Sequence, residues 1–223
     1  MSAPFSPEGD LPPEAEFAPD LSSPKLRAWR LPPVGGMLLL EPARFGDARG
    51  FFSEAWSAEA FARAGVPDAF VQDNHSLSRA VGVVRGLHFQ APPSAQGKLV
   101  RVPRGAIWDV AVDLRAGSPT FGRHAAAVLS AANWRQLWIP PGFAHGFCTV
   151  EPDAEVLYKV DAPYDAAADG GVAWDDPDLG VPWPVDPTAA TLSDKDRRLP
   201  RLRDLPADLF PAAPAAAPAE VAA

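Results

Sequence analysis

The sequence predicts an all-β fold, an antiparallel sandwich or barrel built from short strands. Three observations support this prediction: short apolar segments recur along the chain, turn-forming residues separate them, and helical patterns are almost absent. Many short strands with regular turns are typical of antiparallel sandwiches and barrels. The scarcity of helices disfavours a parallel α/β fold.

Ten segments are expected to form strands. They read GMLLLE, FFSEAW, AFVQDNHS, GVVRGLHFQ, KLVRVP, AIWDVAVDL, AAAVLS, QLWIP, GFAHGFCTV and EVLYKV. Turns are expected between them at Gly46–Asp47, Pro92–Pro93, Pro103–Arg104–Gly105, Gly117–Ser118–Pro119 and Pro140–Pro141–Gly142. One short helix is expected at Ala58–Ala64.

The segment AIWDVAVDL has the clearest strand pattern. Trp108, Val110, Val112 and Leu114 alternate with Asp109, Ala111 and Asp113, so the two sets lie on opposite faces of a strand. A jelly roll built from such strands leaves a central cavity that is open at one end, and a ligand can bind there.

Composition divides the chain into three parts. Residues 1–33 are rich in proline and acids and poor in large apolar residues, so we expect a flexible extension. Residues 34–204 are expected to form the jelly-roll domain. Residues 205–223 are a Pro/Ala-rich segment, for which we expect a disordered tail.

Charge and composition exclude several classes of protein. The net charge of −8 and the pI near 4.9 argue against a general nucleic-acid-binding surface. No apolar run approaches the roughly 20 residues that span a bilayer, and the N-terminus lacks the pattern of a secretory signal. The single cysteine, Cys148, fits a reducing compartment. We therefore expect a cytoplasmic protein.

Four ionisable residues lie in strand segments at positions that point inward. His88 shares a face with Val84, Gly86 and Gln90; Lys98, His145 and Tyr158 likewise alternate with apolar residues. Buried ionisable groups are either paired structurally or line a functional cavity. Periodicity leaves both readings open: His145 fits a hydrogen-bonded core histidine, and Lys98 fits a side chain that reaches the rim.

The sequence shows no metal-binding or dinucleotide-binding pattern. The four histidines include no His-x-His pair, and no histidines and carboxylate cluster as on the strands of metal-binding sandwiches. No glycine-rich loop follows a strand and opens a helix. We therefore expect neither a metal nor an organic cofactor.

A resemblance to a known family carries the functional prediction further. The run GVVRGLHFQAPPSAQGKLVRVPRGAIWDVAVDLRAGSPTFG resembles the dTDP-4-dehydrorhamnose 3,5-epimerase family, and so do DARGFFSE, FVQDNHS, QLWIPPGFAHGF, EVLYKV, WDDPDLGVPWP and LSDKDRRLP. These motifs occur in the family's order over about residues 35–203. The resemblance implies a cupin-type jelly roll, a homodimer without metal or cofactor, and a role in dTDP-L-rhamnose biosynthesis.

The resemblance also implies roles for individual residues. The catalytic base falls on His88 of RGLHFQ and its carboxylate partner on Asp196 of LSDKD. The opposing acid falls on Tyr158 of LYK, and the lysine beside the sugar keto oxygen falls on Lys98 of AQGKLV. The implied substrate is dTDP-4-dehydro-6-deoxy-D-glucose, and the implied product is dTDP-4-dehydro-L-rhamnose.

Further positions match residues that the family uses to bind substrate. Those that line the sugar and phosphate pocket are Gln72, Asn74, Arg85 and His145; Tyr164 flanks the ligand, and Arg49 and Glu54 lie near the nucleotide in the neighbouring subunit. By pattern alone, Tyr164 also fits a surface packing residue and Asp196 a solvated loop acid. Other hypotheses are an epimerase acting at one carbon, a ketoisomerase on a related nucleotide sugar, or a non-catalytic sugar-nucleotide-binding protein.

Overall fold

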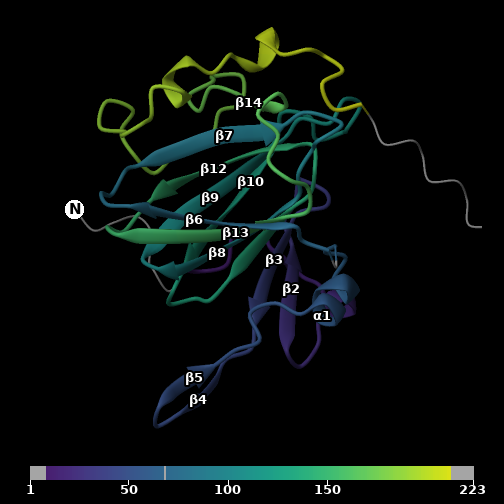
Figure 1. Cartoon of the computed structure of the whole chain (residues 1–223), viewed down its shortest axis with the longest axis vertical. Helices are drawn as coiled ribbons and strands as arrows, with labels where there is room; N and C mark the ends of the chain where they lie inside the picture. Colours follow the sequence, from purple (N-terminus) through teal and green to yellow (C-terminus); the bar gives the residue numbers. More distant parts are fainter. Residues whose placement is uncertain (1–8, 68, 212–223) are drawn as a thin grey trace, which may run out of the picture.

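Two antiparallel sheets packed face to face form the body of the molecule (Figure 1). The computed structural model describes residues 9–67 and 69–211. The predicted all-β fold is confirmed: the strands form an antiparallel sandwich of the jelly-roll, cupin type, with few and short helices.

The larger sheet has seven strands, in the order β1-β2-β3-β11-β8-β13-β6. Their bounds are β1 Glu16–Phe17, β2 Leu26–Arg30, β3 Leu38–Pro42, β11 Gln136–Ile139, β8 Lys98–Arg104, β13 Ala154–Val160 and β6 Gln72–Ser78. The smaller sheet has five strands, in the order β10-β9-β12-β7-β14. Their bounds are β10 His124–Ser130, β9 Ala106–Asp113, β12 Phe143–Thr149, β7 Val84–Gln90 and β14 Asp169–Gly171.

The main core lies between the two sheets. The larger sheet contributes Leu39, Val100 and Val156 to it, and the smaller sheet contributes Ile107 and Phe147. These side chains come from alternate positions of their strands, as the period of two requires. Burial of this shared apolar surface is the main force that holds the sheets together.

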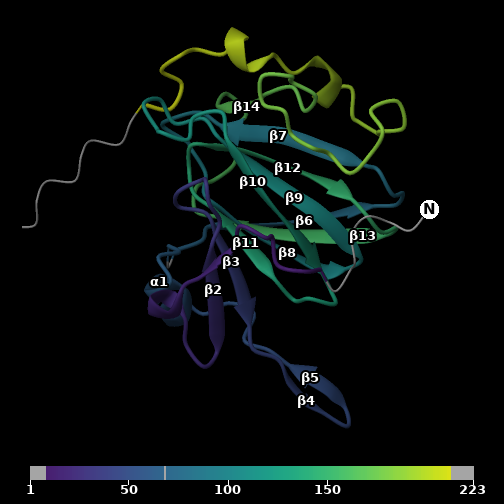
Figure 2. The same cartoon turned by 180° about the vertical axis from the view of Figure 1, so that it is seen from behind.

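The predicted alternation along β9 is confirmed, but both of its faces are buried. Ile107 and Ala111 face the core between the sheets, whereas Val110 and Val112 belong to a second cluster on the far side of the smaller sheet. The C-terminal part of the chain, drawn in yellow-green in Figure 2, covers that side. This cover explains why β9 carries apolar residues on both faces.

The predicted helix is present as α1, Ala58–Arg63, one residue shorter than expected. The Ser57 side chain caps it by accepting from the Ala60 backbone amide, and Phe61 is buried. The strand predicted over FFSEAW is only partly correct. Gly50–Phe52 forms β5, which pairs with β4, Phe45–Asp47, in a separate hairpin, and residues 53–56 are not in a strand.

The N-terminal segment contradicts the expectation of a flexible extension. Within residues 1–33, β1 and β2 pair with each other, and β2 pairs with β3 in the larger sheet. The averaged Pro/acid composition hid the short apolar run around Trp29 and Leu31, and both of these side chains are buried. Residues 1–8 lie outside the described residues.

The start of the predicted C-terminal tail is also ordered. Phe210 is buried, its ring lies 5.4 Å from that of Phe89, and its carbonyl accepts from the Ala116 amide. Phe210, together with the partly buried Leu205 and Leu209, therefore packs residues 205–211 against the domain. The rest of the predicted tail, residues 212–223, lies outside the described residues. In the described part of the chain, no helix has the length and apolar character to cross a membrane.

Candidate active site

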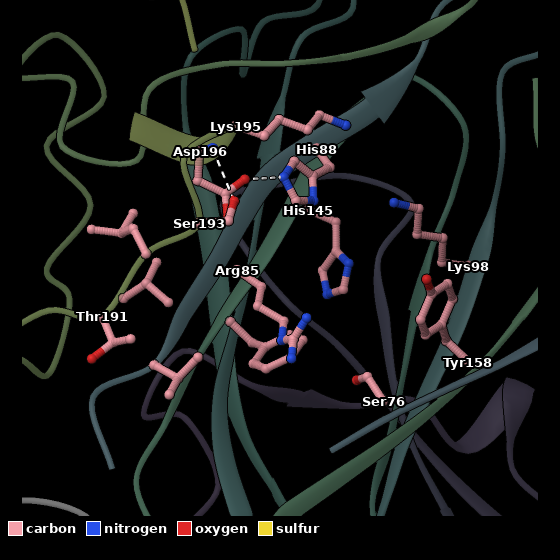
Figure 3. Close-up of a pocket in the computed structure, with 14 residues that line it drawn as sticks. Ser76, Arg85, His88, Lys98, His145, Tyr158, Thr191, Ser193, Lys195 and Asp196 are labelled. Atoms are coloured by element: carbon pink, nitrogen blue, oxygen red, sulfur yellow. Dashed lines mark hydrogen bonds and ion pairs between the residues drawn. The ribbon is translucent and has the colours of Figure 1, made fainter. Parts of the chain in front are cut away.

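A cavity of about 420 Å³ opens between the two sheets beside the C-terminal segment (Figure 3). Six of the eleven residues expected at the site line it: Arg85, His88, Lys98, His145, Tyr158 and Asp196. Its other lining residues are Ser76, Val83, Val84, Phe147, Thr191, Leu192, Ser193 and Lys195. The structure therefore brings together residues that are up to 120 positions apart in the sequence, since Ser76 and Asp196 both line the cavity.

An irregularity in β7 turns two polar side chains toward this cavity. Arg85 and His88 are three positions apart, so a regular strand would direct them to opposite faces. Against β12, His88 pairs with His145 and Arg85 pairs with Phe147, so β7 contains one extra residue between them. This β-bulge lets both side chains line the cavity. The alternation predicted for this segment is wrong at this point.

The bulge depends on Gly86. Its φ is +130°, a conformation that side chains disfavour, and a Cβ there would lie 2.6 Å from the Gly146 Cα and 2.8 Å from the His145 carbonyl oxygen. Only glycine permits so close an approach of β7 to β12 without displacement of the backbone.

His88 and Asp196 form a short polar contact in the cavity, with 2.5 Å between the His88 Nε2 and the Asp196 Oδ1 (Figure 3). Asp196 begins the short 3-10 helix η2, Asp196–Arg198, and is buried. Burial raises the pKa of its carboxyl, but hydrogen bonds from His88 and Ser193 and the nearby positive charges outweigh burial and lower it. The carboxylate is therefore ionised and orients the imidazole.

Tyr158 and Lys98 approach the cavity from the larger sheet, opposite His88 on the smaller one. Burial raises the pKa of the Tyr158 phenol, and the charge of Arg85 offsets part of that rise. Burial lowers the pKa of Lys98 to about 8, although the charges of Asp109 and Asp169 act in the opposite direction. The cavity thus presents an imidazole from one sheet, and a phenol and an amine from the other.

Asp109 on β9 was absent from the predicted site. It is fully buried, and its two carboxylate oxygens lie 3.0 and 3.1 Å from the Nε2 of His145. Its position as an acid within an apolar strand is the sequence signal that could have identified it. The structure thus contains a second histidine–carboxylate pair, on the strands next to the first.

Lys195 and Asp169 were also missed. Lys195 lines the cavity and forms an ion pair with Asp169 on β14. The Tyr164 hydroxyl donates to the same Asp169 carboxylate at 3.2 Å, so this expected residue is linked to the cavity although its own side chain is exposed. No pattern in the sequence marks this pair, because tertiary structure alone brings β14 beside residue 195.

Gln72 and Asn74 lie on β6, on the face that includes the cavity-lining Ser76. The Gln72 side chain donates to the Asn74 side chain at 2.9 Å and accepts from the Tyr164 amide at 3.1 Å. They do not themselves line the cavity. Asn74 is the β6 partner of the cavity-lining Tyr158, so the two amides lie beside the cavity.

Arg49 and Glu54 are not brought to the cavity of their own chain. Arg49 lies in the hairpin of β4 and β5, which projects from the body of the molecule, and it pairs with Asp47 (Figure 1). Glu54 follows this hairpin and pairs with Lys25. The hairpin also carries three exposed phenylalanines: Phe45, Phe51 and Phe52.

Within residues 9–67 and 69–211, no three or more His, Cys, Asp or Glu side chains cluster in a way that would hold a metal ion. The two histidines of the cavity instead each contact one carboxylate. The expectation of a site without metal or organic cofactor stays a prediction.

Comparison with known proteins identifies the relatives of the chain. A family model described as dTDP-4-dehydrorhamnose 3,5-epimerase matches residues 32–204. The enzyme of that name from Sinorhizobium fredii is 53% identical over 173 residues, which cover 78% of this chain and 88% of the relative.

A solved structure and a more distant sequence relative agree with this relationship. The dTDP-6-deoxy-D-glucose-3,5-epimerase of Legionella pneumophila, in complex with dTDP-4-keto-L-rhamnose, aligns with a TM-score of 0.79 at 40% identity, covering 85% of this chain and all of that one. A more distant relative, the dTDP-4-dehydrorhamnose 3-epimerase of Streptomyces niveus, is 38% identical over 173 residues, covering 76% of this chain and 83% of the relative.

Proposed function

The chain belongs to the dTDP-4-dehydrorhamnose 3,5-epimerase family and is an epimerase, and on that premise we propose how its cavity inverts two carbons of one sugar. The substrate is dTDP-4-dehydro-6-deoxy-D-glucose, the product is dTDP-4-dehydro-L-rhamnose, and the pathway is that of dTDP-L-rhamnose. The observation that carries the mechanism is the position of His88 and Tyr158, which line one cavity from opposing sheets.

His88 is the base. The carbons beside a ketone are weakly acidic, and an imidazole removes such a proton near neutral pH. The buried carboxylate of Asp196 fixes the tautomer of His88 through its contact with Nε2 and stabilises the imidazolium as it forms. Nδ1 is the ring nitrogen left to accept the proton, because Nε2 is engaged by Asp196.

Lys98 stabilises the enolate that proton removal creates. Its ammonium lines the cavity and, among the described residues, makes no hydrogen bond or ion pair, so it can bind the sugar keto oxygen. Loss of one well-placed donor to such an oxyanion costs about 3–4 kcal/mol of barrier. A half-buried cation is effective here because the dielectric inside the cavity is lower than that of water.

Tyr158 returns a proton on the other side of the ring. Inversion requires that the proton be removed from one face of the enolate and added to the opposite face. A phenol whose pKa is raised by burial stays protonated at neutral pH and donates to an enolate carbon. The location of Tyr158 on the sheet opposite His88 supports this role.

The functional unit in this proposal is a homodimer. The hairpin of β4 and β5 carries Arg49 and three exposed phenylalanines away from its own cavity. Exposed aromatic side chains grouped on one short element mark a protein contact site. In a dimer the hairpin extends to the partner subunit, where Arg49 and Glu54 contact the nucleotide of the substrate while Arg85 binds the diphosphate.

Counting deuterium atoms tests the reaction. Substrate incubated with the enzyme in heavy water, then reduced and analysed by mass spectrometry and NMR, should carry deuterium at both C3 and C5. Deuterium at C3 alone would favour the alternative of a single-carbon epimerase, the activity named for the 38% identical relative. Binding without exchange would point to a non-catalytic protein.

Two variants test the division of roles. His88→Ala should abolish exchange at both carbons, whereas Tyr158→Phe should retain exchange but slow net inversion by about 10²–10⁴-fold, the usual contribution of a general acid. Fast exchange in the His88 variant would refute its role as the base. Equal loss of exchange and inversion in the Tyr158 variant would refute the role of the phenol.

A further inference from the structure

The buried pair of Asp109 and His145 has no task in the mechanism above. Asp109 lies on β9 and points into the space between the sheets, as its neighbours Ile107 and Ala111 do. His145, whose Nε2 donates to the Asp109 carboxylate, lines the same cavity as Lys98. A fully buried carboxylate beside a reaction cavity is costly unless something compensates its charge.

We propose that the carboxylate of Asp109 is the counter-charge that keeps Lys98 protonated beside the sugar keto oxygen, with His145 holding that carboxylate in place. Asp109 touches no substrate in this arrangement, so it is a positioning residue. The inference rests on the proposed role of Lys98, and it names a residue on which that role depends.

The other charged groups around Lys98 leave Asp109 as its counter-charge. Among the acids, Asp196 pairs with His88 and Asp169 pairs with Lys195. Asp169 raises the pKa of Lys98 less than Asp109 does, and its charge is already compensated by the ammonium of Lys195. The groups that face Lys98 across the cavity are Arg85 and His88 of β7, His145 of β12, Tyr158 of β13, and Lys195 and Asp196 of the C-terminal segment. Arg85 and Lys195 are cations and oppose its protonation.

The electrostatics of the two groups are reciprocal. Burial lowers the pKa of Lys98 to about 8, and the charge of Asp109 is the largest opposing influence. Burial raises the pKa of Asp109, and His145 followed by Lys98 opposes that rise. Each group therefore favours the charged form of the other inside a medium that disfavours both.

The first test is the pH profile of kcat/KM for proton exchange. The native enzyme should lose activity as the pH rises through about 8, when Lys98 loses its proton. Asp109→Asn, which keeps the shape of the side chain and removes its charge, should move this alkaline limb down by about one pH unit or more, the usual effect of one close opposite charge. Asp109→Glu should return the alkaline limb largely to its native pH.

Two further variants separate the counter-charge from other effects. His145→Gln keeps the Asp109 carboxyl but removes the group that most lowers its pKa, so it should lower the rate and move the alkaline limb by less than Asp109→Asn does. Asp113→Asn removes another fully buried acid on the same strand, one bonded to Arg115 away from the cavity, and it should lower the melting temperature without moving the limb. An unmoved limb in Asp109→Asn, or an equal displacement in His145→Gln, would overturn the proposal.

The second test needs no catalysis. Lys98 is labelled with a trace amine-reactive reagent at a series of pH values, and its modification is measured by peptide mass spectrometry in native protein and in Asp109→Asn. The midpoint of labelling should fall in the variant, while that of Lys195, paired with Asp169, stays unchanged in the same digest. The same midpoint for Lys98 in both proteins would overturn the inference even if the epimerase activity is confirmed. A lowered midpoint in a protein that shows no exchange would instead reject the proposed function alone.

Discussion

Replacing Asp196 by asparagine removes one charge from the cavity and almost no volume. The carboxylate oxygen lies 2.5 Å from the His88 Nε2, and the side chain is buried. A hydrogen bond to a charged group contributes about 1.5–3 kcal/mol. If the variant loses that stabilisation when the imidazolium forms, the exchange rate should fall about 10- to 150-fold, since 1.36 kcal/mol corresponds to tenfold in rate.

The assay is the rate of deuterium uptake at saturating substrate, compared with the melting temperature of the same variant. Asp194→Asn provides a matched control, because Asp194 is an exposed acid two residues away that makes no hydrogen bond within the described chain. The control should keep the native rate. A rate for Asp196→Asn within twofold of native, or a loss confined to KM, would refute the reasoning, because Asp196 touches His88 and not the sugar.

Three other predictions concern the fold and the assembly. Gly86→Ala should lower the free energy of unfolding by at least the 1–3 kcal/mol typical of a strained backbone and also reduce kcat, whereas Gly35→Ala, with no atom near its added Cβ, should be neutral in urea unfolding; equal stability of the two would contradict the requirement for glycine in the bulge. The pKa of the Asp113 carboxyl is raised by burial but lowered overall by hydrogen bonds from the following loop, so its stabilisation is present above about pH 4 and should be lost as the pH falls through the lowered value. Thermal unfolding between pH 3 and 6 should show a smaller decrease for Asp113→Asn than for native protein; parallel decreases would exclude Asp113 as a contributor. The double variant Phe51→Ser with Phe52→Ser should shift the molar mass measured by light scattering from dimer toward monomer, and an unchanged dimer would show that the hairpin is not part of the interface.

Most strands of the sandwich were predicted correctly, because the signals of a strand lie within a few consecutive residues. One such signal is the two-residue alternation of side chains along β9, and another is the proline and glycine residues that form turns between strands. The same locality explains the errors. A compositional average over residues 1–33 concealed the apolar run of β2, and a regular period of two could not reveal the extra residue in β7.

The candidate site was predicted largely through resemblance, since charge and periodicity alone left His145 and Asp196 equally consistent with structural roles. Motifs identified the side chains that take part in the reaction, but not Asp109, the buried acid that we propose as the counter-charge of Lys98. Asp109 was visible only as an acid within an apolar strand, and its contact with His145 depends on β9 and β12 being neighbours in the smaller sheet.

The sequence by itself therefore determined the class of fold, the family and the chemical types available to the reaction, because these follow from short-range pattern and motif. Tertiary structure alone decided which faces of the strands meet, that His88 and Tyr158 share one cavity from opposing sheets, and that Arg49 lies away from it. The physical reason is that pairing of distant strands, a single bulge and burial in a low-dielectric interior are properties of contacts between residues far apart in the chain. No local segment encodes them alone.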